Sequence, residues 1–208
     1  MIDIVREGGI WTLTLNRPDK ANSLTAEMLE RLAGLAEEGA RDPELRALVL
    51  TGAGARVFSA GADLEEARAG LATSPLWERV SAAVAALPCL TIAALNGTLA
   101  GGAFGMALAC DLRIAVPSAR FFYPVAKLGF LPQPSDPARM AALIGPARTK
   151  LVLLAGARLD AEEALRVGLI DRIDGDVAGA ARRLAEDALA GDAADLRAIK
   201  AMCGGALR

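Results

Sequence analysis

The chain has 208 residues, of which 53% are apolar and 23% charged, and its net charge is −2. This length and composition predict one folded domain with a sizeable core. The small acidic excess excludes the broad basic surface that binding to nucleic acid or an anionic membrane requires. No uncharged run reaches the ~18 to 20 residues of a membrane-spanning helix, and no leader-like segment opens the sequence. We therefore expect a cytoplasmic protein with no nucleic-acid or membrane partner.

Two features of the composition limit the chemistry. The chain has no histidine, which excludes a histidine base, triad or metal ligand. Cys89, Cys110 and Cys203 are odd in number and have no CxxC spacing, which indicates neither a disulfide framework nor a zinc site. We expect no bound metal. Proton transfer would have to use a carboxyl, Tyr123, a lysine, a thiol or water.

Apolar patterns predict an alternation of strands and helices, which favours an α/β fold. The expected strands are 2–5 and 10–15 (a hairpin), 45–50, 89–95, 112–116, 119–123 and 169–173. The expected helices run from Thr25, as the cap, through Leu35 and over 75–87, 137–144, 146–155 and 161–167, the last with Asp160 as its cap. The proline-rich segment 127–137 is predicted to be irregular. We expect residues 1–175 to form the core domain and 176–208 a C-terminal helical segment, interrupted near Gly191, of the same unit.

Two glycine-containing segments are candidate binding turns. Gly101 and Gly102 precede an uncharged helix-compatible run that extends to Asp111. Glycines at the start of a helix let a ligand approach the backbone, and the first N–H groups have no partner within the helix. Such a turn can bind a developing negative charge, although close helix packing is the alternative. The segment 57–64 has a second such turn at Gly61, followed by Asp63 as the expected cap of a helix.

Several segments in a consistent order resemble the enoyl-CoA hydratase/isomerase, or crotonase, superfamily. They are Leu15-Asn16-Arg17-Pro18 with Asn22, Val49–Gly52, Phe58–Leu64, Ala94–Gly97 with Ala100-Gly101-Gly102, Ala107–Asp111, Leu128-Gly129, and Ala161–Ala164 with Gly168-Leu169-Ile170. The resemblance implies a crotonase-like spiral of ββα turns with a shortened C-terminal helical region. It also implies acyl-CoA thioester substrates and assembly as a homotrimer or hexamer.

The resemblance assigns one shared role to the two glycine turns. It places the two backbone N–H groups that bind the thioester oxygen on Ala62 and Gly102, where they would stabilise an enolate. It places the nucleotide and pantetheine channel at Lys20, Ala21, Ser23, Ala60 and Leu64. Coenzyme A would enter as part of the substrate, and no separate cofactor is implied.

The sequence departs from the family pattern where hydratases have two catalytic glutamates. Those positions fall on Gly105 and Val125, and a third catalytic position of some members falls near Gln133. The remaining polar candidates near the pocket are Glu65, Glu66, Tyr123, Lys127, Gln133, Ser135 and Asp136. Lys127 and Asp136 could also act as a pair. Because family members usually continue beyond the region of Lys200, we expect a more open pocket and a less secure trimer.

Three functions fit this pattern. The first is an enzyme that stabilises an enolate without glutamates, for example by decarboxylating a malonyl-type thioester, a reaction that needs no proton abstraction. The second is an isomerase or hydratase with a relocated carboxyl, at Glu65, Glu66 or Asp136. The third is a non-catalytic acyl-CoA binder or an assembly partner of an active relative.

Overall fold

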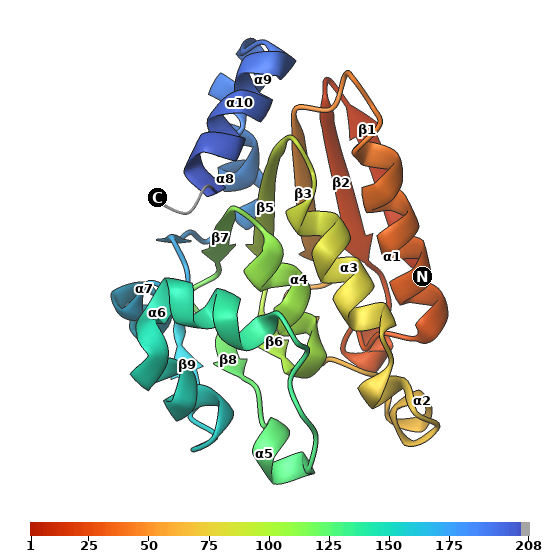
Figure 1. Cartoon of the computed structure of the whole chain (residues 1–208), viewed down its shortest axis with the longest axis vertical. Helices are drawn as coiled ribbons and strands as arrows, with labels where there is room; N and C mark the ends of the chain where they lie inside the picture. The colour runs from red at the N-terminus through yellow and green to blue at the C-terminus, as the bar shows by residue number, and fades with distance from the viewer. Residues whose placement is uncertain (205–208) are drawn as a thin grey trace.

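The computed structural model describes residues 1–204 and contains two β-sheets surrounded by helices (Figure 1). The larger sheet has the strand order β1-β2-β3-β5-β7-β10. Its strands are β1 (Ile2–Glu7), β2 (Ile10–Leu15), β3 (Ala47–Gly52), β5 (Leu90–Leu95), β7 (Leu112–Ala115) and β10 (Arg172–Ile173). All its neighbouring strands are parallel except β1 and β2. The smaller sheet consists of β4 (Val57–Ser59), β6 (Thr98–Ala100), β8 (Arg120–Phe122) and β9 (Leu159–Asp160), in that order.

The helices follow the strands in the alternation that the sequence predicts. They are α1 (Ala26–Gly39), α2 (Leu64–Arg68), α3 (Leu76–Ala85), α4 (Phe104–Ala109), α5 (Val125–Leu128), α6 (Asp136–Leu153), α7 (Ala161–Val167), α8 (Val177–Leu184), α9 (Glu186–Ala190) and α10 (Ala193–Gly204). Single 3₁₀ turns form at Pro18–Lys20, Leu71–Thr73 and Gly101–Ala103. The expected caps are present: the side chain of Thr25 accepts from the N–H of Met28, and Asp63 and Asp160 cap α2 and α7.

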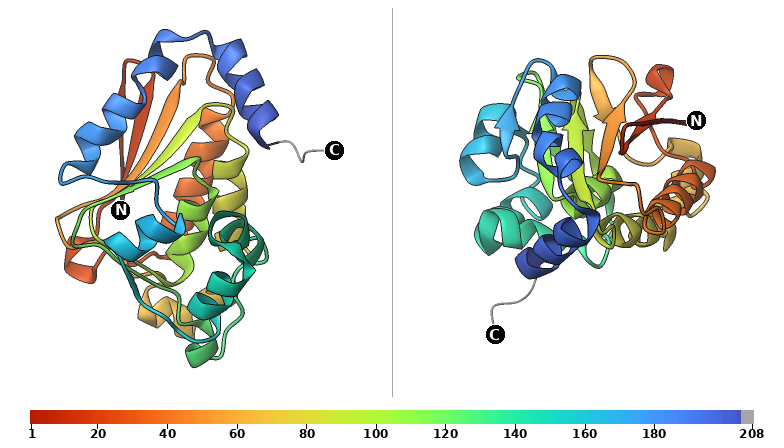
Figure 2. Two further views of the ribbon diagram at one scale, coloured as in Figure 1. Left: turned by 90° about the vertical axis from the view of Figure 1, so that its left-hand side faces the viewer. Right: turned by 90° about the horizontal axis from the view of Figure 1, so that it is seen from above.

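The larger sheet is covered on both faces, as parallel sheets require. On one face, α1, α3 and α4 enclose the main core, in which Phe58, Phe104 and Phe121 are fully buried. On the other face, α8 packs its alanines Ala180 and Ala181 against β5 and β7. Figure 2 shows this layer separated from α1 and α3 by the sheet. The small side chains of α8 let it approach the sheet closely.

The structure differs from the expected elements mainly where the elements are short. The strands β4, β6 and β9 contain two or three residues, too few for a period-two pattern to be visible. The expected strand 169–173 pairs only at Arg172–Ile173. The segment 127–137, expected to be irregular, begins with the last two residues of α5 and ends with the first two residues of α6. The two helices expected on either side of Gly145 are joined there by a non-helical residue with φ 78°. No helix within residues 1–204 has the length and apolarity needed to cross a membrane.

Candidate functional site

A cavity of about 290 Å³ lies between the two glycine turns and the segment that follows β8. Its lining is mainly apolar, and Arg68 is the one charged side chain among the described residues around it. The lining consists of Ala60, Ala62, Leu64, Ala67, Arg68, Ala72, Trp77, Gly101, Gly102, Tyr123, Pro124, Val125, Leu128, Phe130, Leu131 and Gln133. An apolar pocket of this kind with a few polar groups is typical of a small-molecule site.

The two glycine turns meet at one wall of this cavity. Gly61 has φ 90°, and a Cβ placed on it would lie 3.1 Å from the carbonyl oxygen of Ala100 and 3.3 Å from the nitrogen of Gly102. Only glycine therefore permits both the backbone conformation and the close approach. Among the backbone hydrogen bonds of turns, loops and caps in residues 1–204, none has the N–H of Ala62 or of Gly102 as its donor. The structure thus brings the two predicted donors to one cavity, while their catalytic role stays a prediction.

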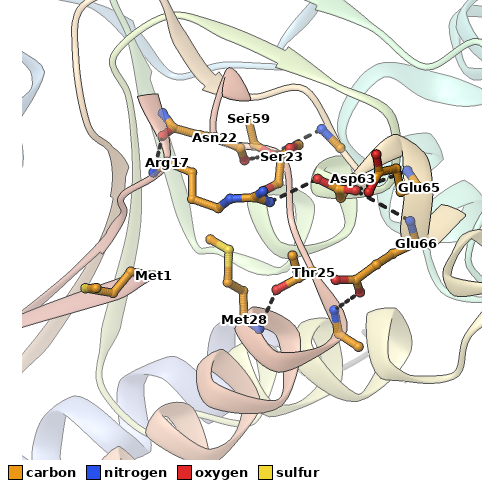
Figure 3. Close-up of polar contacts among 12 residues, drawn as sticks. Met1, Arg17, Asn22, Ser23, Thr25, Met28, Ser59, Asp63, Glu65 and Glu66 are labelled. Atoms are coloured by element: carbon orange, nitrogen blue, oxygen red, sulfur yellow. Dashed lines mark hydrogen bonds and ion pairs between the residues drawn. The ribbon is translucent and has the colours of Figure 1, made fainter. Parts of the chain in front are cut away.

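An isolated β-bridge between Leu24 and Ala62 holds the turn at Gly61 in place. Leu24 donates its N–H to the carbonyl of Gly61 and accepts the N–H of Asp63, both at 2.8 Å. Asp63 caps α2 and also accepts from Arg17 Nη1 at 3.2 Å (Figure 3). Hydrogen bonds between Leu24 and both neighbours of Ala62, and the contact of Asp63 with Arg17, therefore hold the conformation of this turn.

The two glutamates of α2 do not reach the cavity. Glu66 accepts the N–H of Ala26 at 2.7 Å through Oε2, which ties α2 to the start of α1 (Figure 3). Glu65 is exposed, and neither side chain is part of the cavity wall. Their negative charges lie in the first turn of α2, where they interact favourably with the helix dipole.

The residues predicted to bind coenzyme A are adjacent but only partly at the cavity. Ala60 and Leu64 line it. Ala21 accepts the N–H of Ala60 at 3.0 Å, so the segment with Lys20 and Ser23 lies directly beside them. Lys20 is exposed and Ser23 is buried. Their binding role remains a prediction.

Tyr123, which lines the cavity, forms a hydrogen-bonded pair with the buried Asp136. The Tyr123 ring stacks on Phe104 with 5.3 Å between centroids, and its hydroxyl donates to Asp136 Oδ2 at 3.0 Å. Asp136 is fully buried, and its Oδ1 has no hydrogen-bond partner within the described residues. Gln133 lines the cavity beside Tyr123, whereas the exposed Lys127 borders a different hollow, next to Arg158. The structure therefore pairs Asp136 with Tyr123 and not with Lys127.

Asp136 points its unpaired oxygen at Gly105. A Cβ placed on Gly105 would lie 3.0 Å from Asp136 Oδ1. Gly105 lies three residues after Gly102, and residues so spaced on a helix are neighbours on one face. The carboxyl of Asp136 thus occupies the space that a side chain at position 105 would need, one helical turn from Gly102.

Burial raises the pKa of Asp136 from its ordinary 3.8 to about 7. The hydrogen bond from Tyr123 and the charge of Arg139 act in the opposite direction, while Glu78 raises the pKa further. Burial also raises the pKa of the Tyr123 hydroxyl, and the negative charge of Asp136 reinforces this. Asp136 therefore changes its charge near neutral pH and Tyr123 stays protonated.

This raised pKa predicts that the free energy of unfolding falls as the pH rises. Asp136 ionises near pH 4 in the unfolded chain and only near pH 7 in the folded chain. The stability that the folded state gains from holding this proton is therefore fully present below pH 4 and is lost as the pH rises to about 7. We expect a decrease of about 2 to 3 kcal/mol between pH 5 and pH 7. Urea denaturation of the wild type and of Asp136→Asn at both pH values measures it. The absence of histidine removes the usual competing titration, and an equal decrease in Asp136→Asn would contradict this origin.

Sequence reasoning missed several residues of the cavity wall. Trp77 is buried, with its indole N–H donating to the carbonyl of Leu71 at 2.8 Å, and it lines the cavity as well. Leu128, Phe130 and Leu131 line the cavity while remaining exposed. Apolar residues in a proline-rich segment that is predicted to be irregular are the sequence signal that could have identified this wall. No cluster of metal-ligating side chains occurs in residues 1–204.

Comparisons with known proteins agree with this architecture. The model of the enoyl-CoA hydratase/isomerase family matches residues 5–206. YngF of Bacillus subtilis is 39% identical over 166 residues, which are 77% of this chain and 64% of that protein. Carnitinyl-CoA dehydratase of Citrobacter koseri is 38% identical over 83% of this chain and 67% of its own length. The chain thus spans about two thirds of the length of these relatives.

Solved structures extend the similarity to the fold. The enoyl-CoA hydratase of Bacillus anthracis superposes with a TM-score of 0.89 and 32% sequence identity, over 96% of this chain and 80% of that one. The expected crotonase-like α/β fold is thereby confirmed. The match of the family model over nearly the whole sequence shows that this chain belongs to the enoyl-CoA hydratase/isomerase family.

Proposed function

We propose that this protein binds an acyl-CoA thioester in the cavity and stabilises an enolate on the thioester oxygen with the N–H groups of Ala62 and Gly102. The observation that carries the proposal is the meeting of two glycine turns, some 40 residues apart in sequence, at one apolar cavity. Preorganised donors in a site shielded from water stabilise a developing oxyanion, and a single donor is typically worth about 3 to 4 kcal/mol. The names of the relatives, which include a carnitinyl-CoA dehydratase, support this substrate class.

The lining of the cavity supports an apolar acyl group. The side chains of Leu64, Trp77, Val125 and Phe130 provide apolar surface around the two N–H groups. Because Gly105 and Val125 stand where the family resemblance places the hydratase glutamates, the proposal does not include the two-glutamate mechanism.

Infrared spectroscopy of a bound thioester tests the proposed N–H donors. We expect butyryl-CoA labelled with ¹³C at the thioester carbonyl to bind, and its carbonyl band to shift to lower frequency because two hydrogen bonds polarise the bond. Titration calorimetry would measure the affinity separately. Failure to bind any thioester of an acyl-chain panel, or binding with an unshifted carbonyl band, would contradict the proposal.

One observation favours decarboxylation as a second candidate. The guanidinium of Arg68 is the one charge among the described groups around the cavity, and it could pair with the carboxylate of a malonyl-type thioester. Loss of carbon dioxide would form the enolate without a base. This candidate predicts turnover of malonyl- or methylmalonyl-CoA, weakened in Arg68→Gln, with negligible hydration of crotonyl-CoA. Fast crotonyl-CoA hydration that survives removal of every nearby carboxyl would exclude it.

Assembly and location are part of the proposal. We propose a trimer or hexamer, which the family resemblance implies, and a cytoplasmic location. Analytical ultracentrifugation would measure the oligomeric state directly, and a monomer at micromolar concentration would contradict the proposed assembly.

A further inference from the structure

We infer that Tyr123 and Asp136 form the proton-transfer pair of this site, with the Tyr123 hydroxyl as the group that meets the substrate and Asp136 as the group that holds the proton. The inference rests on the proposed function, because the pair needs a thioester bound at the Ala62 and Gly102 donors. It adds to that function the side chains that could make or quench an enolate.

The geometry places the two residues in series. Tyr123 lines the cavity, whereas Asp136 lies behind it and is fully buried. The hydroxyl of Tyr123 connects them through its 3.0 Å hydrogen bond to Asp136 Oδ2. A proton that leaves the cavity through Tyr123 therefore has an acceptor already aligned.

The surroundings of Asp136 are those of a group that changes its charge during turnover. Its Oδ1 has no partner among the described residues and faces Gly105, which has no side chain to stabilise it. A buried carboxylate oxygen without a donor is costly, so the ionised form readily takes up a proton. The resulting pKa of about 7 suits a base that works near neutral pH. A purely structural carboxyl would be expected to have both oxygens bonded.

The charged groups around Asp136 come from two helices. Glu78 of α3 raises the pKa of Asp136, and Arg139 of α6 lowers it. Glu78 itself accepts the N–H and the hydroxyl of Ser135, at 3.1 and 3.0 Å. The neighbouring helix α4 presents Gly105 at this point. Nothing on these elements offers Asp136 a salt bridge within residues 1–204.

The proposed step is a relay of two protons, with a net transfer of one proton from the substrate to Asp136, and all atoms balance. The oxygen of Tyr123 takes the proton from the carbon next to the thioester carbonyl while its own proton passes to Asp136 Oδ2. The electron pair of the broken C–H bond forms the carbon–carbon double bond of the enolate, and the carbonyl π pair moves onto the thioester oxygen. Tyr123 is neutral before and after the step, so its raised pKa is no obstacle. The reverse step protonates the enolate.

Hydrogen exchange at this carbon tests the pair without knowledge of the overall reaction. The wild type is incubated with butyryl-CoA in D₂O, and deuterium at the carbon next to the carbonyl is followed by mass spectrometry. We expect Asp136→Asn and Tyr123→Phe each to slow the exchange by ~100-fold or more. The exchange rate of the double variant should be no lower than that of either single variant, because the two residues act as one unit. Glu65→Gln, which removes an exposed carboxyl outside the cavity wall, should exchange at the wild-type rate.

The pH profile and the carbonyl band separate the possible outcomes. The wild-type rate should rise with pH and level off above about pH 7, as Asp136 ionises. Unchanged exchange in Asp136→Asn and Tyr123→Phe, or slower exchange explained by weaker butyryl-CoA binding, would overturn the pair while the proposed function stands. Binding with a shifted carbonyl band but no exchange in the wild type would have the same meaning. Failure of the wild type to bind butyryl-CoA or shift its carbonyl band would overturn the proposed function and the pair together.

Discussion

Gly105→Glu is expected to destabilise the fold by about 3 kcal/mol or more, and Asp136→Ala is expected to restore most of that loss. The new side chain would enter space that the carboxyl of Asp136 occupies. A Cβ at position 105 would lie 3.0 Å from Asp136 Oδ1. Overpacking of this kind costs about 1 to 3 kcal/mol, and two carboxyls sharing one buried space add like-charge repulsion. Urea denaturation of the two single variants and the double variant measures the coupling between the positions.

A second glycine of the same protein provides a control for this double-mutant cycle. Gly34 also lies inside a helix, α1, but a Cβ placed on it meets nothing within 4 Å. Gly34→Glu should therefore be neutral or slightly stabilising, because glycine is a poor helix former. We expect a coupling of about 2 kcal/mol between Gly105→Glu and Asp136→Ala. Simple additivity of the two changes would show that the carboxyl of Asp136 does not fill this space.

Gly61→Ala is expected to slow any enolate chemistry at the cavity by about 100- to 1,000-fold. The new methyl group would lie 3.3 Å from the nitrogen of Gly102 and 3.1 Å from the carbonyl of Ala100. Relief of this crowding separates the two turns and moves one proposed donor away from the other. The deuterium-exchange rate with butyryl-CoA and the position of its carbonyl band report the change.

Gly54→Ala is the control that separates the effect of backbone strain from the effect of this crowding. Gly54 has φ 83°, close to the 90° of Gly61, but its nearest neighbour would be Pro18 at 3.8 Å, an ordinary contact. Both variants should lose stability by about 1 to 2 kcal/mol. Only Gly61→Ala should lose activity as well. Equal activity of the two variants would contradict a role for the approach of Gly61 to Gly102.

The sequence predicted those parts of the fold that local rules determine. Thr25, Asp63 and Asp160 are caps because short polar side chains satisfy the first N–H groups of a helix, whatever the rest of the chain does. The main parallel strands are visible as apolar runs because both faces of their sheet are buried. The strands β4 and β6 were missed because they are short and are stabilised by partners distant in sequence.

The candidate site was only partly predictable for a related reason. Glycines at 61 and 102 indicate a close backbone approach in the sequence itself, but the contact between them forms only in the tertiary structure. Tyr123 and Asp136 were two among several polar candidates, and nothing in their spacing distinguishes them from Lys127 or Glu65. Their hydrogen bond depends on how α6 packs against α4, and the raised pKa of Asp136 depends on burial that no local pattern encodes.

The position of Tyr123 gives this protein a built-in reporter. It is the chain's single tyrosine, and it stacks on Phe104 at the cavity wall with its hydroxyl on Asp136. Biosynthetic incorporation of 3-fluorotyrosine would therefore produce one fluorine resonance, located at the candidate site. Occupancy of the cavity and the charge of Asp136 could both be followed through that resonance in the intact protein, without a substrate assay.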